Sequence, residues 1–316
     1  MREKPITVFL TGGLGNQLFQ LAHALSLDPE REVHLEWKLG KPRCGSDGLP
    51  DINIFQLPGR VHLMSSPKYS WIASKTAGYL LRSGISPKHW ESFQFVKNIS
   101  KFLGSIILST HFRKRMTIAA ASGIGNSTVS INDSNCFVIG YFQSYKFARK
   151  ENVLIDLKSM DLVHQNQKII ELRDMAKDEK PIIVHFRFGD YKSEKSFGIP
   201  NQSYYQKAIS ELAQRLPASK IWVFSDEKEE AEKVYPPELA PRTRWITDKE
   251  FSSAETLQIM RLGESYVIAN STFSWWAAIL SASKNPAVIC PEPWFQFENE
   301  PIDLIPLDWN RVMAWQ

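Results

Sequence analysis

Short apolar runs that alternate with helical segments are the feature that most constrains the fold of this chain. The expected strands are Ile6–Leu10, Val33–Trp37, Cys136–Phe142, Ile182–Phe186, Ile221–Phe224, Tyr266–Ala269 and Ala287–Cys290. The expected helices are Gln17–Leu27, Asn152–Met175, Tyr204–Leu216, Ser253–Leu262 and Phe273–Ser281. This alternation predicts an α/β fold with parallel sheets covered by helices.

The length of 316 residues allows two domains with sizeable cores. We expect a first domain over residues 1–155 and a second over residues 156–316, with a C-terminal tail that can pack back on the first. Polar motifs follow strands in both halves, which predicts a ligand cleft between the two domains. The stretch from Ser65 to Ser130 mixes aromatic, basic and apolar residues, suggests short helices and loops, and contains no motif that we can place.

Composition and charge exclude several classes of protein. The net charge of +4 is mild, and no concentrated basic stripe of the kind that binds nucleic acid is present. Three cysteines, Cys44, Cys136 and Cys290, lie far apart and form no CxxC pair. A zinc site and a disulfide framework are therefore not expected, and the cysteines fit a cytoplasmic protein.

One uncharged segment, Ser265–Ser283, is long enough to span a bilayer. Its centre contains Asn270, Ser271, Thr272 and Ser274, and its first half is strand-like whereas its second half is helical. We interpret it as a buried strand, a turn and a buried helix. No membrane anchor is expected, so the protein would meet a membrane-bound substrate only from the surface.

A glycine-rich turn, Thr11–Gln17, follows the first expected strand. Glycines between a strand and a helix let the backbone approach a ligand, and the helix N-terminus favours an anion. The turn is neither a Walker A loop nor a full dinucleotide fingerprint, because no Gly-Lys-Ser/Thr follows and Leu18 occupies the last glycine position. A simple capped tight turn is an equally good interpretation of these residues alone.

The segment His185–Tyr191 follows the strand at Ile182 and contains an arginine suited to phosphate. The guanidinium of Arg187 offers a planar fork of donors, and His185 points to the same side of the strand. Asp190 could orient Arg187 or accept a proton. The alternative is a structural arginine–aspartate pair at the strand end.

Two further motifs follow strands in the second half. In Asn270–Trp276, the hydroxyls of Ser271 and Thr272 and the free backbone N–H groups suit a phosphate, although helix capping explains them equally. The last two tryptophans of this motif read as core residues. In Ser225-Asp226-Glu227, a carboxylate could bind guanine or mark the start of a helix.

No Asp-x-Asp sequence occurs in the chain. Carboxylates at that spacing commonly hold a divalent cation on a nucleotide diphosphate. We therefore expect no metal and no cofactor, with the charge of the leaving group neutralised by side chains such as Arg187 and by helix ends.

Together these motifs resemble the α-1,2-fucosyltransferases of glycosyltransferase family 11. The resemblance lies in five ordered strings that span most of the chain: Gly12–Gln20, Gly140–Ser144, His185–Tyr191, Phe224–Asp226 and Asn270–Trp276. It implies a GT-B-like fold, with two Rossmann-like domains facing across a cleft and the donor held mainly by the second. The implied reaction is a metal-independent, inverting transfer of L-fucose from GDP-β-L-fucose.

The resemblance also implies the site. Arg187 would bind the diphosphate, and with Asp190 and His185 it forms the expected catalytic set. The expected donor-binding residues are Asn16, Gly15, Arg187, Ser225, Asp226, Asn270, Ser271, Thr272 and Phe273. The implied acceptor is a terminal galactose of a glycan, such as a lipid-linked O-antigen unit, met in the cytoplasm or at the cytoplasmic face of the inner membrane.

One position departs from the pattern. Related fucosyltransferases often carry two adjacent arginines, and Phe188 occupies the second position here. Asp190 and His23 are the candidates for a catalytic base, although a core or surface histidine fits His23 better. The alternatives to fucosyl transfer are another GDP-sugar, another linkage, or a non-catalytic nucleotide-sugar or glycan-binding protein.

Overall fold

The computed structural model of this protein divides into two compact units. The first unit consists of Met1–Met160 with Pro301–Ile305, and the second of Asp161–Glu300 with Pro306–Gln316. The structure describes residues 5–40, 42–64, 103, 106–107, 116–120, 125, 135–164, 166–192, 197–247, 250–297 and 300–315. Most of the stretch 65–130 therefore lies outside the described residues.

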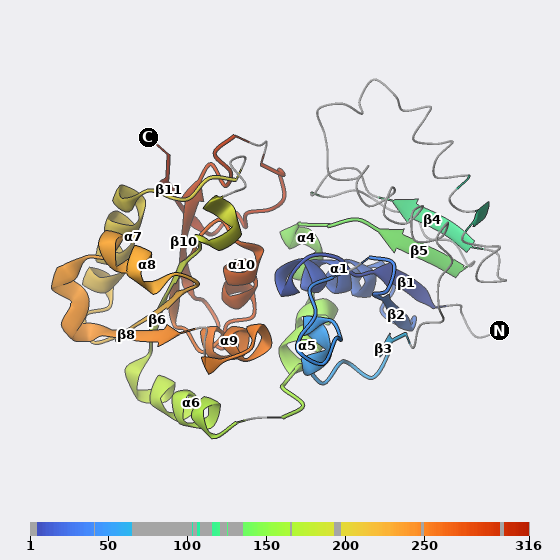
Figure 1. The fold of residues 1–316 in the computed structure, drawn as a ribbon, viewed down its shortest axis with the longest axis horizontal. Coiled ribbons are helices and arrows are strands. Elements are labelled where there is room, and N and C mark those ends of the chain that lie inside the picture. The colour runs from blue at the N-terminus through green and yellow to red at the C-terminus, as the bar shows by residue number, and fades with distance from the viewer. Residues whose placement is uncertain are drawn as a thin grey trace. The chain divides into compact units, whose positions relative to one another are not determined.

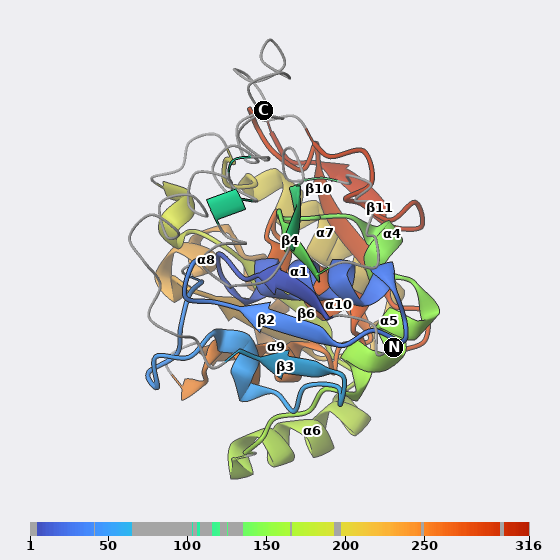
Figure 2. The same cartoon turned by 90° about the vertical axis from the view of Figure 1, so that its right-hand side faces the viewer.

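The first unit is built on a parallel sheet with the strand order β3-β2-β1-β5-β4 (Figure 1). Its strands are β1 (Ile6–Phe9), β2 (Val33–Glu36), β3 (Val61–Leu63), β4 (Met116–Ala120) and β5 (Asn135–Ile139). Figure 2 shows β3 and β2 of this sheet low in the picture and β4 above them. Its helices are α1 (Leu14–Leu27), α4 (Tyr145–Ala148), α5 (Glu151–Ser159) and the short η1 (Asp51–Ile54), and α1 packs against α4 and α5.

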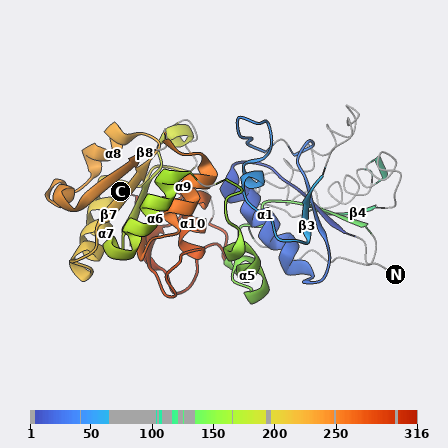
Figure 3. The same ribbon diagram turned by 90° about the horizontal axis from the view of Figure 1, so that it is seen from below.

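The second unit has a parallel sheet with the order β11-β10-β9-β6-β7-β8. Its strands are β6 (Ile182–Phe186), β7 (Ile221–Ser225), β8 (Thr243–Thr247), β9 (Ser265–Val267), β10 (Ala287–Glu292) and β11 (Asn310–Met313). Its helices are α6 (Gln167–Glu179), α7 (Gln202–Arg215), α8 (Lys228–Val234), α9 (Ser253–Met260) and α10 (Thr272–Ile279), with short turns η3 (Gly189–Lys192) and η4 (Pro237–Arg242). Helices α7 and α8 cover one face, and α9 and α10 cover the other (Figures 1 and 3).

The expected α/β class with two Rossmann-like domains is confirmed, since every strand pairing in both sheets is parallel. The uncharged segment Ser265–Ser283 does form a strand, a turn and a helix, β9 followed by α10. Within the part of the chain that is described, no helix is both long and apolar enough to cross a membrane.

One expected helix is wrong. The segment Asn152–Met175 forms two helices, α5 and α6, because the chain leaves helical geometry at Met160 and restarts at Asn166. The side chain of Asn166 caps α6 by accepting a hydrogen bond from the N–H of Ile169 at 3.0 Å. An N-cap residue of this kind marks a new helix start. The strand expected at Cys136–Phe142 ends at Ile139, and Phe142 has a φ of 52°.

A segment from late in the chain completes the first unit. Residues Pro301–Ile305 belong to that unit although the residues on both sides belong to the other. The carbonyl of Asp303 accepts from the N–H of Tyr145 at 2.8 Å, and its carboxylate lies 2.8 Å from Lys146 Nζ. Leu304 and Ile305 are buried. These contacts fix the start of α4.

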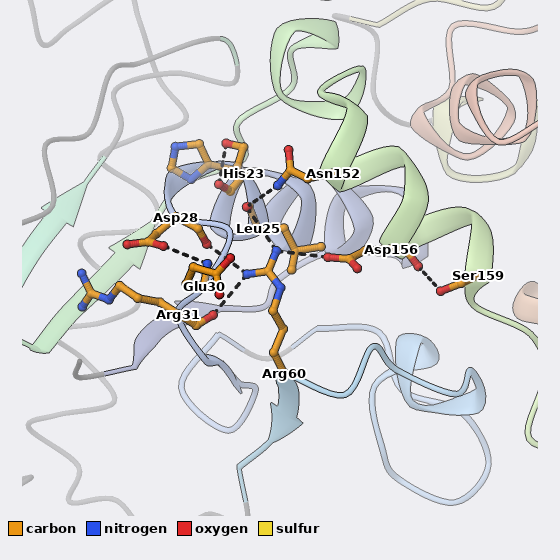
Figure 4. Close-up of polar contacts among 10 residues, drawn as sticks. His23, Leu25, Asp28, Glu30, Arg31, Arg60, Asn152, Asp156 and Ser159 are labelled. Atoms are coloured by element: carbon orange, nitrogen blue, oxygen red, sulfur yellow. Dashed lines mark hydrogen bonds and ion pairs between the residues drawn. The ribbon is translucent and has the colours of Figure 1, made fainter. Parts of the chain in front are cut away.

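Arginine side chains close the C-terminal ends of a helix in each unit. Arg60, just before β3, donates to the carbonyl oxygens of Asp28 at 3.0 Å and Arg31 at 3.1 Å, and its second nitrogen contacts the carboxylate of Asp156 at 3.1 Å (Figure 4). Arg242 likewise donates to the carbonyls of Ala213 and Leu216 at the end of α7. A cation here satisfies carbonyls that the helix leaves unpaired and complements the helix dipole.

We expect Arg60→Ala to lower the free energy of unfolding by about 1–3 kcal/mol, because three carbonyl and carboxylate acceptors lose a largely buried donor. Urea unfolding of the intact protein measures this change. The matched control is Arg215→Ala, whose exposed pair with Glu211 should contribute less than about 0.5 kcal/mol. Equal effects of the two substitutions would contradict the capping role.

Candidate active site

The strand order of the second sheet reverses between β6 and β9. From β6 the chain extends to β7 and β8 on one side, and to β9, β10 and β11 on the other. Open α/β sheets bind ligands at such a reversal, outside the carboxyl ends of the strands. The motif His185–Tyr191 starts in the last two residues of β6 and continues beyond it, and Asn270–Phe273 follow β9, so the structure brings these two predicted motifs together at the reversal.

Arg187 lies directly after β6 and forms an ion pair within this site. Its Nη1 is 2.9 Å from Oδ2 of Asp226, and the two side chains are 22% and 17% exposed. The other carboxylate oxygen of Asp226 accepts the backbone N–H of Phe188 at 2.9 Å. Arg187 therefore forms an arginine–aspartate pair at the strand end with Asp226, which follows β7.

The surroundings of Phe188 show why a phenylalanine fits at the position where related fucosyltransferases often carry a second arginine. Its side chain is buried in the apolar core beneath α7, and its ring lies parallel to that of Phe186, with 6.1 Å between ring centroids. Phe186 in turn packs on Tyr205 of α7 at 4.1 Å. Position 188 thus faces the hydrophobic core, where a guanidinium would have no aqueous contact.

His185 is buried beside Arg187. Burial and the neighbouring guanidinium lower the pKa of His185 to about 3, so the ring is neutral at pH 7 and is a weak proton acceptor. Its centroid lies 6.0 Å from the ring of Phe273. This geometry favours packing and hydrogen bonding at the site over general base catalysis.

Asn270 holds the loop after β9 in place. Its amide nitrogen donates to the carbonyls of Phe197 and Gly198 at 3.0 and 3.1 Å, and its carbonyl oxygen Oδ1 is buried without a hydrogen-bond partner among the described residues. Ser271 accepts the N–H of Phe273 at 3.3 Å, which confirms the capping interpretation of this residue. Thr272 and Phe273 are half-buried.

The remaining predicted residues of the second unit are placed as follows. The hydroxyl of Ser225 accepts the N–H of Glu227 at 3.0 Å and so shapes the turn that carries Asp226. Asp190 belongs to the turn η3, but its side chain lies outside the described part of the structure. Trp275 and Trp276 are fully buried, as expected.

The first sheet has a similar reversal, between β1 and β5. The glycine turn follows β1 and the segment Gly140–Ser144 follows β5. The amide of Gln143 donates to Oδ1 of Asn16 at 3.1 Å, and Gln20 donates to the carbonyl of Gly140 at 3.0 Å. Gly12 has a φ of 72°, and a Cβ there would lie 2.5 Å from Nδ2 of Asn16. The close contact between the Asn16 side chain and the backbone of this turn therefore requires a glycine at position 12.

His23 is a core residue and not a candidate base. Its ring is fully buried on α1 and lies parallel to that of Phe142, with 3.7 Å between ring centroids. Burial, followed by the nearby charge of Lys150, lowers the pKa of His23 to about 3. Neither ring nitrogen has a hydrogen-bond partner within the described residues.

The described residues contain no group of three or more His, Cys, Asp and Glu side chains arranged to hold a metal ion. At the second reversal, a negatively charged ligand would meet the guanidinium of Arg187 and the backbone N–H groups at the start of α10.

The architecture of two parallel α/β units, each with polar loops at a strand-order reversal, defines a GT-B-like protein. Residues 106–312 match the model described as Glycosyl transferase family 11, and the chain belongs to that family. The expected family is confirmed, and the protein is a glycosyltransferase.

Two bacterial relatives match over nearly the whole chain. An Alpha-1,2-colitosyltransferase of Escherichia coli is 27% identical over 96% of this chain and 97% of its own length. The O-antigen biosynthesis glycosyltransferase WbnK of Escherichia coli is 26% identical over 92% and 95%, respectively. A crystal structure of the fucosyltransferase NodZ from Bradyrhizobium aligns with a TM-score of 0.46 and 14% identity, over 88% of this chain and 94% of that chain. An overlap this loose bears on neither substrate nor linkage.

Some contacts at the site could not be read from the sequence. Tyr191 donates its hydroxyl hydrogen to the carbonyl of Asn270 at 3.0 Å, and Phe197 supplies a carbonyl to the Asn270 amide. Tyr191 stands within the motif that follows β6, but a tyrosine there gives no signal of its partner. The loop at Phe197 carries no motif at all.

We expect Phe188→Arg to lower the free energy of unfolding by more than about 3 kcal/mol, because an unpaired charge would enter an apolar core. It should not raise affinity for a nucleotide diphosphate. Urea unfolding and calorimetric titration with GDP measure the two effects. A stable variant that binds GDP more tightly than wild type would show that position 188 faces the ligand.

The buried His23 gives the protein a specific acid sensitivity. Its pKa is about 3 when folded and 6.5 in the unfolded chain, so between these values the unfolded state binds more protons. Stability should therefore fall as the pH drops from 6.5 toward 3, by up to about 1.4 kcal/mol per pH unit from this residue. His23→Phe should remove this contribution, and leave that of His185, in unfolding measured at a series of pH values.

The control is His62→Phe, which replaces an exposed histidine of the same unit. An unchanged slope in His23→Phe would mean that His23 is not held neutral in the folded protein.

Proposed function

We propose that the protein is an α-1,2-fucosyltransferase that moves L-fucose from GDP-β-L-fucose to a terminal galactose. The proposal rests chiefly on the guanidinium of Arg187, which lies beside the strand-order reversal. The reversal is where open α/β sheets bind nucleotides. A fixed guanidinium there would stabilise the negative charge that develops on departing GDP.

Several neighbouring groups support donor binding at this position. The N-terminus of α10, capped by Ser271, presents backbone N–H groups that favour a phosphate. Thr272 adds a hydroxyl, and the half-buried ring of Phe273 suits a base or sugar face. The buried Oδ1 of Asn270 has no partner among the described residues and can accept a hydrogen bond from the donor. The donor-binding roles of Gly15 and Asn16 stay predictions.

The proposed reaction inverts the configuration at the sugar carbon. The bond between this carbon and the diphosphate oxygen breaks, and the acceptor hydroxyl attacks from the opposite face. We propose that no divalent cation takes part, since Arg187 and the α10 terminus supply positive charge to the leaving group. Asp190 remains the proposed base.

The acceptor proposed here is a galactose-terminated glycan of an O-antigen unit, in keeping with the named role of the relative WbnK. A lipid-linked acceptor would be met in the cytoplasm at the surface of the inner membrane.

Transfer of colitose is the second candidate, because the relative matched at 27% identity is named for that sugar. Colitose is L-fucose without the 3-hydroxyl group. A site that hydrogen-bonds a hydroxyl rejects the analogue without it by about 10⁴-fold or more, whereas a site that ignores it discriminates weakly. The ratio of kcat/KM for the two activated sugars therefore decides between the candidates.

The test is transfer from GDP-fucose, with and without EDTA, to a panel of terminal β-galactosides, and determination of the linkage by NMR. We expect an α-1,2 product that EDTA does not reduce. A preference for activated colitose would identify the second candidate. GDP binding without product would indicate a non-catalytic binding protein.

Arg187→Ala should lower kcat by about 10²–10³-fold, because the developing charge on GDP loses its guanidinium. Circular dichroism and urea unfolding should show that the variant remains folded. A folded Arg187→Ala protein with near-normal turnover would refute the proposed role of Arg187.

A further inference from the structure

Two protein groups beside the guanidinium of Arg187 have no assigned role in orienting it. The carboxylate of Asp226 lies against one edge, with 2.9 Å between Nη1 and Oδ2. The guanidinium lies over the ring of Tyr191, with 5.8 Å from the guanidinium carbon to the ring centroid. We call Asp226 and Tyr191 the Arg187 clamp.

Both carboxylate oxygens of Asp226 face the loop that carries Arg187. Oδ1 accepts the N–H of Phe188, and the buried Oδ2 is in ion-pair contact with Arg187 but accepts no aligned hydrogen bond from the described residues. The approach is close enough that a Cβ on Gly189 would lie 2.6 Å from Oδ2. A carboxylate that reads guanine must offer both oxygens to N1–H and the 2-amino group. In this geometry, Asp226 offers them to the loop that carries Arg187.

Tyr191 joins the two loops on either side of the strand-order reversal. Its hydroxyl donates to the carbonyl of Asn270 at 3.0 Å, and its ring packs on Phe197 at 5.4 Å. The carbonyl of Phe197 in turn accepts the Asn270 amide. Tyr191, Asn270 and Phe197 thus form a closed set of contacts that fixes the tyrosine ring beside Arg187.

We propose that Asp226 and Tyr191 are positioning residues that fix the guanidinium of Arg187 for the departing diphosphate, and that Asp226 does not read the base. The inference rests on the proposed function of Arg187. An arginine has several rotatable bonds, and an ion pair to Asp226 together with the neighbouring Tyr191 ring restricts that freedom before the ligand arrives. A displacement of about 1 Å at such a group can cost a hundredfold in rate.

The clamp has a distinctive effect on binding and catalysis. The Asp226 carboxylate orients Arg187 but also repels the incoming phosphates, so its loss has opposing effects on ground-state binding of GDP. Orientation matters most for charge that develops in the transition state. Removal of the carboxylate charge should therefore reduce kcat far more than the affinity for GDP.

The first experiment uses Asp226→Asn in the full-length protein, with GDP and inosine diphosphate as ligands. Inosine diphosphate lacks the 2-amino group of guanine, so the ratio of the two dissociation constants reports base reading. We expect kcat to fall about 10-fold or more, with the GDP to inosine diphosphate ratio as in wild type. A ratio that collapses toward one, or an unchanged kcat, would overturn the assignment.

The second experiment tests whether Tyr191 acts through Arg187. Tyr191→Phe removes only the hydroxyl that bonds to Asn270, and should lower kcat about 5-fold, as loss of one hydrogen bond implies. In an Arg187→Lys background, the same substitution should have an effect of less than about two-fold, because the planar group that it orients is absent. Equal losses in both backgrounds would show that Tyr191 acts independently of Arg187.

Matched controls come from the opposite edge of the same sheet. Glu179 pairs with Arg244 at 2.8 Å and is as exposed as Asp226, at 17%. The hydroxyl of Tyr235 bonds to Thr243 at 2.5 Å. Glu179→Gln and Tyr235→Phe should change the free energy of unfolding. They should leave kcat, and the ratio of the dissociation constants for GDP and inosine diphosphate, as in wild type. If a control substitution lowered kcat as much as the clamp variants do, the loss of activity in the clamp variants would be a general effect on folding and the assignment would be overturned.

Measurements of GDP binding and turnover distinguish failure of the clamp from failure of the proposed function on which it rests. A wild-type protein that binds no GDP overturns the proposed function and the clamp together. An active wild type whose Asp226→Asn and Tyr191→Phe variants turn over normally overturns only the clamp.

Discussion

The reversal of strand order beside the first strand of each sheet is the constraint on which both polar sites depend. Parallel strands joined by right-handed crossovers are added to a sheet on either side of its first strand. Where the chain changes from one side to the other, the loops on the two sides diverge and leave a crevice at the carboxyl ends of the strands. In the second sheet this places the residue after β6 next to those after β9, although 83 positions separate Arg187 from Asn270 in the numbering. The first sheet uses the same arrangement to bring Gln143 to Asn16.

Burial distinguishes the side chains that can contact a ligand from those that pack in the core. Phe188 and Arg187 are neighbours, but the alternation of side chains at a strand end sends one into the core and leaves the other partly exposed beside Asp226. The same principle explains the two histidines with lowered pKa values, which are held neutral where water cannot reach them. Arg187, by contrast, stays partly exposed at this edge, where it pairs with the Asp226 carboxylate and lies over the Tyr191 ring.

The strands next to Arg187 and Asn270 could be predicted from sequence, because continuous apolar runs such as Ile182–Phe186 mark strands buried on both faces. The edge strands β8 and β11 were missed, since they are half-exposed and carry charged residues such as Arg244 and Arg311. The order of the five motifs indicated the family and the loops that follow β6 and β9 at the candidate site. The pairing of Arg187 with Asp226 was not predictable, because it depends on how closely two neighbouring loops approach across Gly189.

The five residues Pro301–Ile305 give the first unit an unusual relation to the order of synthesis. Their contacts with Tyr145 and Lys146 can form only after residues more than 150 positions beyond the start of α4 have been made. During translation, the contacts that hold the start of α4 are therefore among the last of that unit to form. A single cut in the chain after Met160 would also separate Pro301–Ile305 from the rest of the first unit.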